Sequence, residues 1–262
     1  MKIGIMGYGV VGRAINHTLS NEFEVIKYDK FNNYDSFSSI LSTSAVFISV
    51  PTSLNRSTGQ LDMSAIEDCL QKLSDGNYPD SNPVIIKSTV SPDQIISLSV
   101  NYNLNICLNP EFLRESTTPN EDFENQKIIV IGTDSRDTFY YVKSMYEKVL
   151  HPSASYFQTT LQEASLIKLA QNATLASRVA VSNLIYDACS EYNVEYQKVK
   201  EIAFDPFEII GPHMTIVPGP DGKRGFGGKC LPKDSQAFAS LFDRSFFDNL
   251  LKYNKTLRDD LE

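Results

Sequence analysis

The feature that most constrains the fold of this chain is a glycine turn near its N-terminus. A short apolar strand, Lys2 to Met6, runs into Gly7-Tyr8-Gly9-Val10-Val11-Gly12, and an apolar-periodic helix follows from about Val10 to Leu19. A second strand, Glu24 to Tyr28, ends at Asp29, close to the offset of ~20 residues expected for an acid that follows such a turn. This order predicts a βαβ unit that binds a dinucleotide.

The residue types in this turn suit a phosphate-bearing ligand. Gly7 makes the tight turn, Gly9 lets a pyrophosphate approach the backbone, and Gly12 lets the helix pack on the strand. Asp29 would accept hydrogen bonds from ribose hydroxyls, which favours NAD over its 2′-phosphorylated form. The alternative is a βα turn without a ligand. The predicted cofactor residues of this unit are Gly7, Gly9, Val10, Val11, Gly12 and Asp29.

Strands and helices continue to alternate through the first part of the chain. This alternation predicts a mostly parallel, doubly wound sheet, which we interpret as a Rossmann domain over residues 1–158. The further strands are expected at Ala45–Val50, Val84–Lys87, Asn105–Leu108 and Lys127–Ile131, and the main helices at Met63–Leu73 and Arg136–Val149.

Three polar segments follow strands of this sheet: Val50–Ser53, Lys87–Val90 and Asn109–Glu115. In open α/β sheets, ligands lie beyond the carboxyl ends of the strands. We therefore expect these hydroxyls and carboxylates to lie near a nicotinamide and a substrate. Ser, Thr and Pro are also common in turns and caps, so a purely local role for each stays open.

The pattern changes after His151-Pro152. One long helix without Gly or Pro is predicted from about Leu161 to Glu191, and it opens a small all-α domain over residues 159–262. A narrow seam of small and apolar residues along this helix suits close packing against another helix, so a homodimer is predicted. The seam consists of Leu166, Leu169, Ala173, Ala176 and Ala180, and shorter helices are expected at Glu195–Phe204, Pro232–Phe242 and from Ser245 to the C-terminus.

Two polar residues of the long helix, Lys168 and Asn172, are four residues apart and share one face. Asparagine has poor helix propensity, so its presence there needs a reason. The pair is either part of a solvated polar face or a lysine and an amide that together hold an oxyanion.

A second glycine segment, Gly225-Phe226-Gly227-Gly228-Lys229-Cys230-Leu231-Pro232-Lys233-Asp234, places a cysteine at the predicted start of a helix. The helix N-terminus and the two flanking lysines favour the thiolate of Cys230 over the thiol. The alternative is a buried, inert cysteine in a flexible loop. The preceding segment, Asp205 to Lys229, is rich in Gly and Pro, and we interpret it as a substrate loop.

Composition excludes several other classes of function. The formal net charge is −8 without a basic stripe, which argues against a nucleic-acid binder. The four cysteines form no CxxC pair, which argues against a zinc site or a disulfide framework. The chain also lacks a signal peptide and any apolar run of membrane-spanning length. A cytoplasmic protein without a metal or a membrane partner is expected.

These motifs together resemble the UDP-glucose/GDP-mannose dehydrogenase family, and they occur in the family's order. The matching elements are the first glycine turn with Asp29, Val50-Pro51-Thr52, Lys87-Ser88-Thr89-Val90, Asn109 to Glu115, Glu163 to Asn172, and Gly225 to Asp234. The family normally continues beyond the position of Glu262 into a domain that binds the uridine diphosphate. The resemblance is therefore to a short form without that domain.

The resemblance implies an NAD-dependent oxidation of the C6 alcohol of a nucleotide sugar, UDP-glucose first, to the carboxylate. Cys230 would attack the aldehyde to give a thiohemiacetal. A second NAD would take a hydride from the thiohemiacetal to give a thioester, which water would hydrolyse. Lys168 and Asn172 would stabilise the oxyanions, Asp234 and Thr89 would hold a water, and Glu111 would act as general base. Thr52, Ser88, Glu115 and Lys233 would line the nicotinamide, while Gly227 and the backbone of Phe112, Leu113 and Arg114 would contact the sugar and its phosphates.

Two other functions stay open at this point. A single-step dehydrogenase of the β-hydroxyacid type would use Lys168 and Asn172 without needing Cys230. A catalytically silent protein could instead bind NAD and pair with a full-length dehydrogenase.

Overall fold

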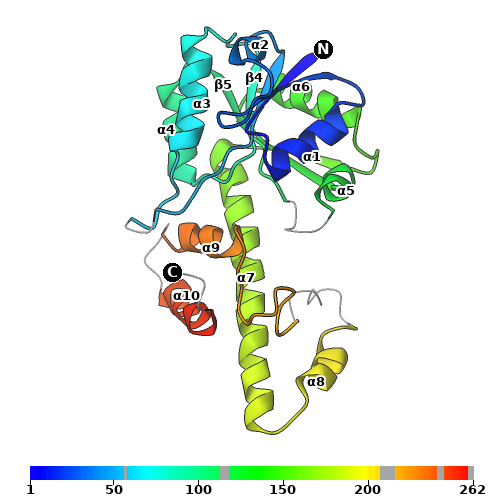
Figure 1. Cartoon of the computed structure of the whole chain (residues 1–262), viewed down its shortest axis with the longest axis vertical. Helices are drawn as coiled ribbons and strands as arrows, with labels where there is room; N and C mark the ends of the chain where they lie inside the picture. Colours follow the sequence, from blue (N-terminus) through cyan, green and yellow to red (C-terminus); the bar gives the residue numbers. More distant parts are fainter. Residues whose placement is uncertain (56–57, 113–117, 207–215, 241–244, 259–262) are drawn as a thin grey trace. The chain divides into compact units, whose positions relative to one another are not determined.

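The computed structural model describes residues 1–55, 58–112, 118–206, 216–240 and 245–258. The chain divides into two units (Figure 1). Unit 1 comprises Met1–Asn55 and Leu61–Lys168, and unit 2 comprises Arg56–Gln60 and Leu169–Glu262. The functional division at residues 158 and 159 stays a prediction. Among the described helices, none is both long and apolar enough to cross a membrane.

Unit 1 is built on a seven-stranded sheet in the order β2-β1-β3-β4-β5-β6-β7. The first five strands pair in parallel, β6 is antiparallel to β5, and β7 is parallel to β6. The predicted doubly wound α/β fold is thus confirmed. The strands are β1 (Lys2–Met6), β2 (Glu24–Tyr28), β3 (Ala45–Ile48), β4 (Pro83–Ile86), β5 (Asn105–Leu108), β6 (Ile128–Gly132) and β7 (Ser155–Thr159).

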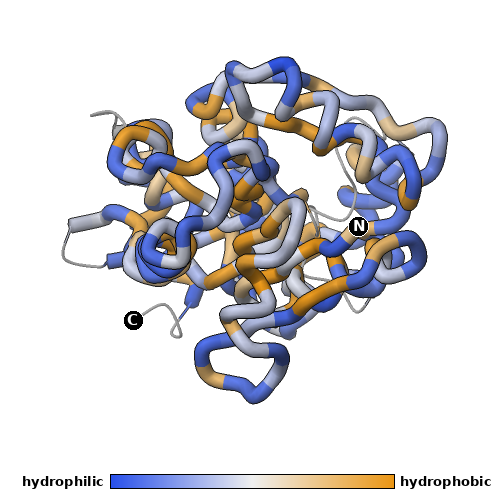
Figure 2. Tube along the Cα trace, turned by 90° about the horizontal axis from the view of Figure 1, so that it is seen from above, coloured by the Kyte–Doolittle hydropathy of each residue, from blue (hydrophilic) through white to orange (hydrophobic). Residues whose placement is uncertain are grey.

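The helices of unit 1 connect these strands, and the core lies between helices and sheet. The residues of β3 and β4 are buried on both faces, as expected for parallel strands covered by helices. Hydrophobic and hydrophilic residues alternate along the helical turns of the trace (Figure 2). The helices are α1 (Val10–Leu19), α2 (Phe37–Ile40), α3 (Ser64–Asp75), α4 (Pro92–Asn101), α5 (Pro119–Glu124) and α6 (Arg136–Glu147).

Helices alone make up the regular structure described for unit 2. The long helix α7 (Leu161–Glu191) begins in unit 1, and from Leu169 onward it belongs to unit 2. The other helices are α8 (Tyr196–Ala203), α9 (Leu231–Ala239) and α10 (Ser245–Leu257). A small core forms where Ala176 and Ala180 of α7 meet Phe226 and Leu250. The predicted small-residue seam therefore serves, at least in part, to pack helices within one chain.

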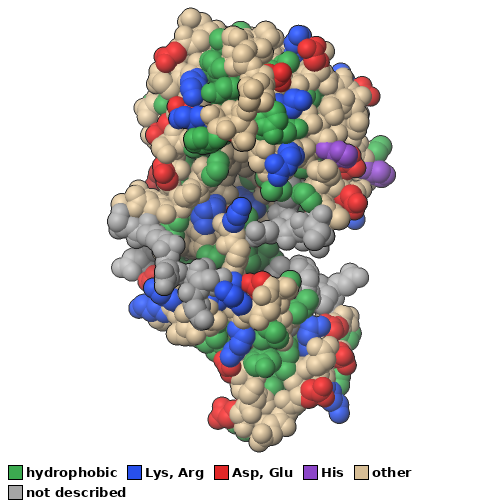
Figure 3. Space-filling view, in the orientation of Figure 1, with side chains coloured by type: hydrophobic (Ala, Val, Ile, Leu, Met, Phe, Trp, Pro, Cys, Tyr) green, Lys and Arg blue, Asp and Glu red, His purple; other side chains and the backbone are tan. Residues whose placement is uncertain are grey.

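The surface carries charges of both signs. On the face shown in Figure 3, Lys and Arg side chains are interspersed with Asp and Glu side chains on both units. This mixed pattern matches the moderate negative net charge of −8.

Candidate active site

The glycine turn after β1 has a backbone that only particular residues allow. Gly7 has a φ of +88°, and its N–H donates to the Tyr28 carbonyl at 2.9 Å. A Cβ at Gly12 would lie 2.2 Å from the Gly7 carbonyl oxygen, so the packing of α1 on the turn requires this glycine. Among the described residues, a Cβ at Gly9 would meet no atom within 4 Å. The protein itself does not require a glycine at that position, and the open backbone leaves room for a ligand.

Asp29 is tied to the same turn. Its carboxylate accepts hydrogen bonds from the N–H groups of Tyr8 and Phe31, both at 3.0 Å, and from the Asn32 amide at 2.8 Å. Burial alone would raise the pKa of Asp29, but these donors outweigh it and hold the pKa below its usual range. The acid is thus fixed as a carboxylate beside the turn.

These features fit a dinucleotide. The helix α1 begins at Val10 without a side-chain cap, so its first N–H groups are available to a phosphate. The exposed backbone at Gly9 and the carboxylate of Asp29 stand at the two places where a pyrophosphate and a ribose are expected.

The described parts of the three polar segments, Val50–Ser53, Lys87–Val90 and Asn109–Phe112, follow the neighbouring parallel strands β3, β4 and β5, as predicted. The sheet order reverses between β1 and β3, and such a switch point is where ligands of open α/β sheets bind. Ser49 Oγ donates to the Gly7 carbonyl at 2.7 Å, and Ser88 Oγ donates to the Val50 carbonyl at 2.6 Å. Thr52 is buried and Thr89 is half-buried. The Ser88 hydroxyl therefore also has the local role of holding the turn after β3.

A buried ion pair lies at the next two strand ends. Lys87 Nζ is 2.9 Å from Glu111 Oε2 and donates to Asn109 Oδ1 at 2.9 Å. Sequence reasoning placed Glu111 in the site but gave Lys87 no role. Leu113, Arg114 and Glu115, which were predicted to bind substrate and cofactor, lie outside the described residues.

Lys168 lies in the first part of α7, and the surrounding contacts fix it to unit 1. Thr160 and Glu163 form reciprocal hydrogen bonds at the start of the helix. Ser165 Oγ donates to the Val90 carbonyl at 2.7 Å, directly after the segment that carries Thr89. The Lys168 ammonium lies 5.4 Å from the centroid of the Phe112 ring. Two residues predicted to contact the substrate, Lys168 and Phe112, are thus brought together.

In unit 2, the fully buried carboxylate of Asp234 contacts two other residues of the predicted site, Asn172 and Lys233. Asp234 has no exposed surface. Its Oδ2 accepts from the Asn172 amide and its Oδ1 pairs with Lys233 Nζ, both at 2.5 Å. A solvated polar face is therefore the wrong interpretation for Asn172, which is 4% exposed. The Asp234 N–H donates to the Cys230 carbonyl at 2.8 Å, so this carboxylate lies one helical turn after the cysteine.

Cys230 differs from the other cysteines. It is exposed and stands directly before α9, whereas Cys69, Cys107 and Cys189 are buried. Burial raises the pKa of the Cys69 and Cys107 thiols to about 12, which favours the thiol over the thiolate at neutral pH. Cys230 is therefore not buried, and exposure at a helix N-terminus is the environment expected for a reactive thiol. Its reactivity stays a prediction.

The glycine segment before Cys230 is clamped by α10. Asn254 accepts from the Phe226 N–H at 2.7 Å and donates to the Phe226 carbonyl at 2.9 Å. A Cβ at Gly227 would lie 2.3 Å from the Arg258 guanidinium, which is buried and pairs with Asp221 at 2.7 Å. Sequence reasoning missed Asn254 and Arg258, because no local pattern links either residue to a loop about 30 positions away.

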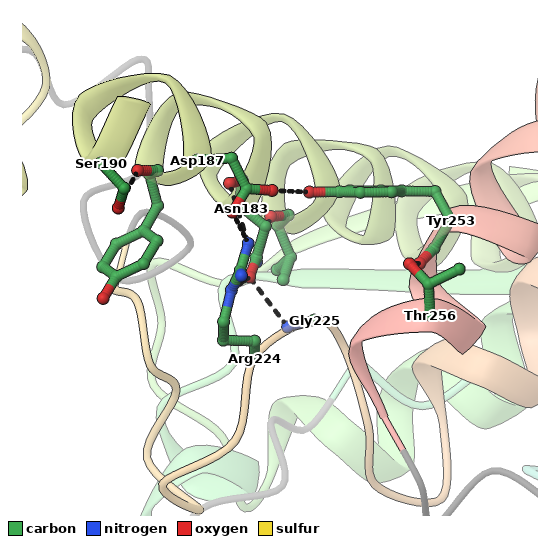
Figure 4. A network of polar contacts seen from close by, with 9 residues as sticks. Asn183, Asp187, Ser190, Arg224, Gly225, Tyr253 and Thr256 are labelled. Atoms are coloured by element: carbon green, nitrogen blue, oxygen red, sulfur yellow. Dashed lines mark hydrogen bonds and ion pairs between the residues drawn. The ribbon is translucent and has the colours of Figure 1, made fainter. Parts of the chain in front are cut away.

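A second clamp holds the same segment to α7 (Figure 4). Arg224 Nη2 pairs with Asp187 Oδ1 at 2.5 Å and donates to the Asn183 carbonyl at 3.3 Å. The Gly225 N–H donates to Asn183 Oδ1 at 3.0 Å, and Tyr253 OH donates to Asp187 Oδ2 at 2.9 Å. The described part of the segment that leads to Cys230 is therefore held in place by residues of α7 and α10.

Two family models match this chain. The NAD binding domain of the UDP-glucose/GDP-mannose dehydrogenase family matches residues 24–150, and the central domain of that family matches residues 162–256. The two matches together account for most of the sequence. The chain belongs to the UDP-glucose/GDP-mannose dehydrogenase family. Its N-terminal part is the family's NAD-binding domain, and NAD is the cofactor that the glycine turn fits.

Relatives of this family member include the UDP-glucose 6-dehydrogenase of Rickettsia bellii. That protein is 31% identical over 239 residues, which cover 88% of this chain and 52% of the relative. The chain spans about half the length of the curated relatives it matches.

Solved structures share the fold. The UDP-glucose dehydrogenase of Pyrobaculum islandicum superposes with a TM-score of 0.81 at 23% identity, covering 97% of this chain and 68% of that one. The 3-hydroxyisobutyrate dehydrogenase of Mycobacterium tuberculosis gives a TM-score of 0.75 at 15% identity, covering 98% and 94%. The fold is common to both kinds of dehydrogenase, so the side chains of the site must distinguish them.

Proposed function

We propose that this chain is an NAD-dependent dehydrogenase that oxidises the C6 alcohol of a nucleotide sugar, UDP-glucose first, to the carboxylate. One observation carries the proposal: the exposed Cys230 stands one turn before Asp234, a buried carboxylate that Asn172 and Lys233 hold in place. A dehydrogenase that stops at a single two-electron step has no need of a nucleophile. The family membership and the fit of the glycine turn to NAD support the same conclusion.

In this proposal the bound NAD supplies the hydride acceptor for each of two oxidations. Cys230 holds the intermediate aldehyde as a thiohemiacetal and then the acid as a thioester, so the aldehyde is never released. Lys168 and Asn172 stabilise the negative charge that develops on the sugar oxygen. Asp234 and Thr89 hold the water, and Glu111 takes a proton from it during hydrolysis.

The remaining site residues have binding roles in the proposal. Thr52, Ser88, Glu115 and Lys233 line the nicotinamide, and Gly227 with the backbone of Phe112, Leu113 and Arg114 contacts the sugar and its phosphates. Residues 1–158 act as the NAD domain and residues 159–262 as the domain for substrate and dimer contacts.

We also propose a cytoplasmic homodimer through α7. Val181 and Leu184 of this helix are 53% and 52% exposed, which leaves apolar surface that a second copy could cover. Light scattering at micromolar concentration should give twice the mass of one chain, and a monomer there would contradict the dimer.

The test of the activity is NADH formation by purified protein. Wild type and Cys230→Ser are each incubated with NAD and, in turn, UDP-glucose, GDP-mannose and their N-acetylated relatives. The proposal predicts NADH with at least one sugar and a loss of acid product in Cys230→Ser. If no nucleotide sugar gives NADH that depends on Cys230, the proposal is wrong.

A second candidate is a single-step hydroxyacid dehydrogenase, a class of enzyme that shares this fold. It would use Lys168 and Asn172 alone. Full turnover of a β-hydroxyacid by Cys230→Ser would establish it. A protein that binds NAD but turns over neither substrate class would instead be the silent partner of another dehydrogenase.

A further inference from the structure

Lys87 carries a charge in a place where a charge is costly. Its side chain is 1% exposed, directly after β4. Its backbone N–H donates to the Ile48 carbonyl at 2.8 Å, which fixes where the side chain starts. Removing an ammonium from water is strongly unfavourable unless well-placed partners compensate for it. The identity of those partners therefore indicates what the lysine is for.

Three groups contact the Lys87 ammonium in the described structure. Nζ pairs with Glu111 Oε2 at 2.9 Å and donates to Asn109 Oδ1 at 2.9 Å. It also lies 5.5 Å from the centroid of the Phe123 ring, a residue of α5 with no exposed surface. Contacts on these separate sides leave the ammonium little freedom to move.

Asn109 is itself anchored, so it can serve as a fixed support. Its Oδ1 also accepts from Tyr146 OH at 2.5 Å, and its Nδ2 donates to the Val130 carbonyl at 2.6 Å. Tyr146 belongs to the core of unit 1 and Val130 to the middle of β6. The position of the lysine is thus set by the sheet and by α6.

Glu111 accepts contacts on both oxygens of its carboxylate. It lies in a segment without regular structure after β5, and its side chain is 9% exposed. Oε2 meets Lys87, and Oε1 accepts from the neighbouring Phe112 N–H at 2.9 Å. The contact with Lys87 is an ion pair and the contact with the Phe112 N–H is a hydrogen bond, and they lie on different oxygens. Of the two, only Lys87 ties it to the sheet.

We infer that Lys87 is a positioning residue, which fixes the Glu111 carboxylate for the hydrolysis step of the proposed function. The inference rests on that function, since it takes from it the role of Glu111. In the hydrolysis, the oxygen of water bonds to the acyl carbon and the carbon–sulfur bond to Cys230 breaks. The sulfur leaves as thiolate, one water proton passes to Glu111, and the second is released as the product acid ionises. Lys87 acts only through Glu111.

The experiment separates formation of the thioester from its release. Protein is mixed with NAD and UDP-glucose and quenched in acid at successive times, and intact mass and NADH are measured on the same samples. In Lys87→Met, NADH and the covalent adduct should form within about threefold of the wild-type rate. Steady-state turnover should fall at least ~10-fold and at most by the roughly 10²–10⁴-fold that general acid–base catalysis contributes, and most chains should carry the adduct.

Two further variants serve as controls. Lys143 also pairs with a glutamate, Glu147, at 3.4 Å and lies 5.6 Å from an aromatic ring, that of Tyr156, but it has no place in the site. Lys143→Met should therefore behave as wild type. If Lys87→Met does not fold, Lys87→Arg keeps the charge with a different geometry, and the adduct should still accumulate.

Three outcomes would overturn the inference. In the first, the folded Lys87 variants accumulate no more adduct than wild type. In the second, they slow adduct formation and release by the same factor, which indicates a general structural role. In the third, wild type forms neither adduct nor NADH with UDP-glucose, GDP-mannose or their N-acetylated relatives, which refutes the proposed function and the inference with it.

Discussion

The two glycine segments look alike in the sequence, but their glycines have different reasons to be glycine. At Gly9 of the first segment, an added Cβ would meet no atom within 4 Å in the part of the chain that the structure describes. At Gly227 of the second segment, it would lie 2.3 Å from the buried Arg258 guanidinium. No neighbouring atom among the described residues requires a glycine at position 9, which points to a ligand. Gly227 is explained by packing within the chain, which shows that a glycine close to Cys230 can be required by a neighbouring side chain.

The largest loss of stability is expected at Gly12, where an added side chain would clash with backbone. A Cβ would lie 2.2 Å from the Gly7 carbonyl oxygen, and backbone cannot move aside as a side chain can. Gly12→Ala should lower the free energy of unfolding by about 3 kcal/mol or more. Denaturant titration measures it, and a loss below ~1 kcal/mol would show that α1 can shift on the sheet.

A smaller loss is expected for Gly227→Ala, because Arg258 is a flexible side chain. Displacing it from Gly227 should cost about 1–3 kcal/mol in unfolding free energy. The double variant Gly227→Ala/Arg258→Ala should recover part of this loss relative to additivity, since the clash disappears with the guanidinium. Purely additive losses would mean that the two residues do not interact.

Gly9→Ala should separate binding from stability. Gly9 has a φ of −79°, which any residue adopts, so the unfolding free energy should change by less than about 0.5 kcal/mol. NAD affinity should fall about 10-fold, or ~1.4 kcal/mol, as measured by calorimetric titration. If the NAD affinity of Gly9→Ala is unchanged, the prediction that the pyrophosphate approaches the backbone at Gly9 is wrong.

The smallest effect concerns Asp29 and pH. Because the folded-state pKa of Asp29 is lowered, its stabilising contribution is present above the unfolded-state pKa of about 3.9 and is lost as pH falls through the folded value. Asp29→Asn should therefore be slightly less stable than wild type at pH 6, and the difference should shrink towards pH 2. Since the side chain is only half-buried, solvent screens its contacts and the effect is modest. A difference that grows on acidification would contradict the assigned direction.

Several elements could be predicted from the sequence because their signals are local. The structure has β1, β2, β5 and α7 with the predicted bounds. The strands β3 and β4 end earlier than predicted, at Ile48 and Ile86, because Val50 and Lys87 already belong to the loops of the site. The helix α4 was missed, although Ser91 and Gln94 form a capping box that the sequence shows.

Other features could not have been predicted, because they depend on contacts distant in sequence. The strand β7 is short and mostly exposed, so it lacks a clear apolar alternation. The pairing of Lys87 with Glu111 joins residues of two strand ends, and the clamp of Asn254 on Phe226 joins residues 28 positions apart. Such pairs become visible only when the fold brings the elements together.

The central claim is a four-electron oxidation through Cys230, and the stoichiometry of NADH tests it most directly. A limiting amount of UDP-glucose is converted to completion with excess NAD, and the NADH formed is divided by the sugar consumed. Because an alcohol becomes an acid by loss of two hydrides, the account predicts about two NADH per sugar for wild type and no more than about one for Cys230→Ala. A ratio of one that is the same in both proteins would contradict it.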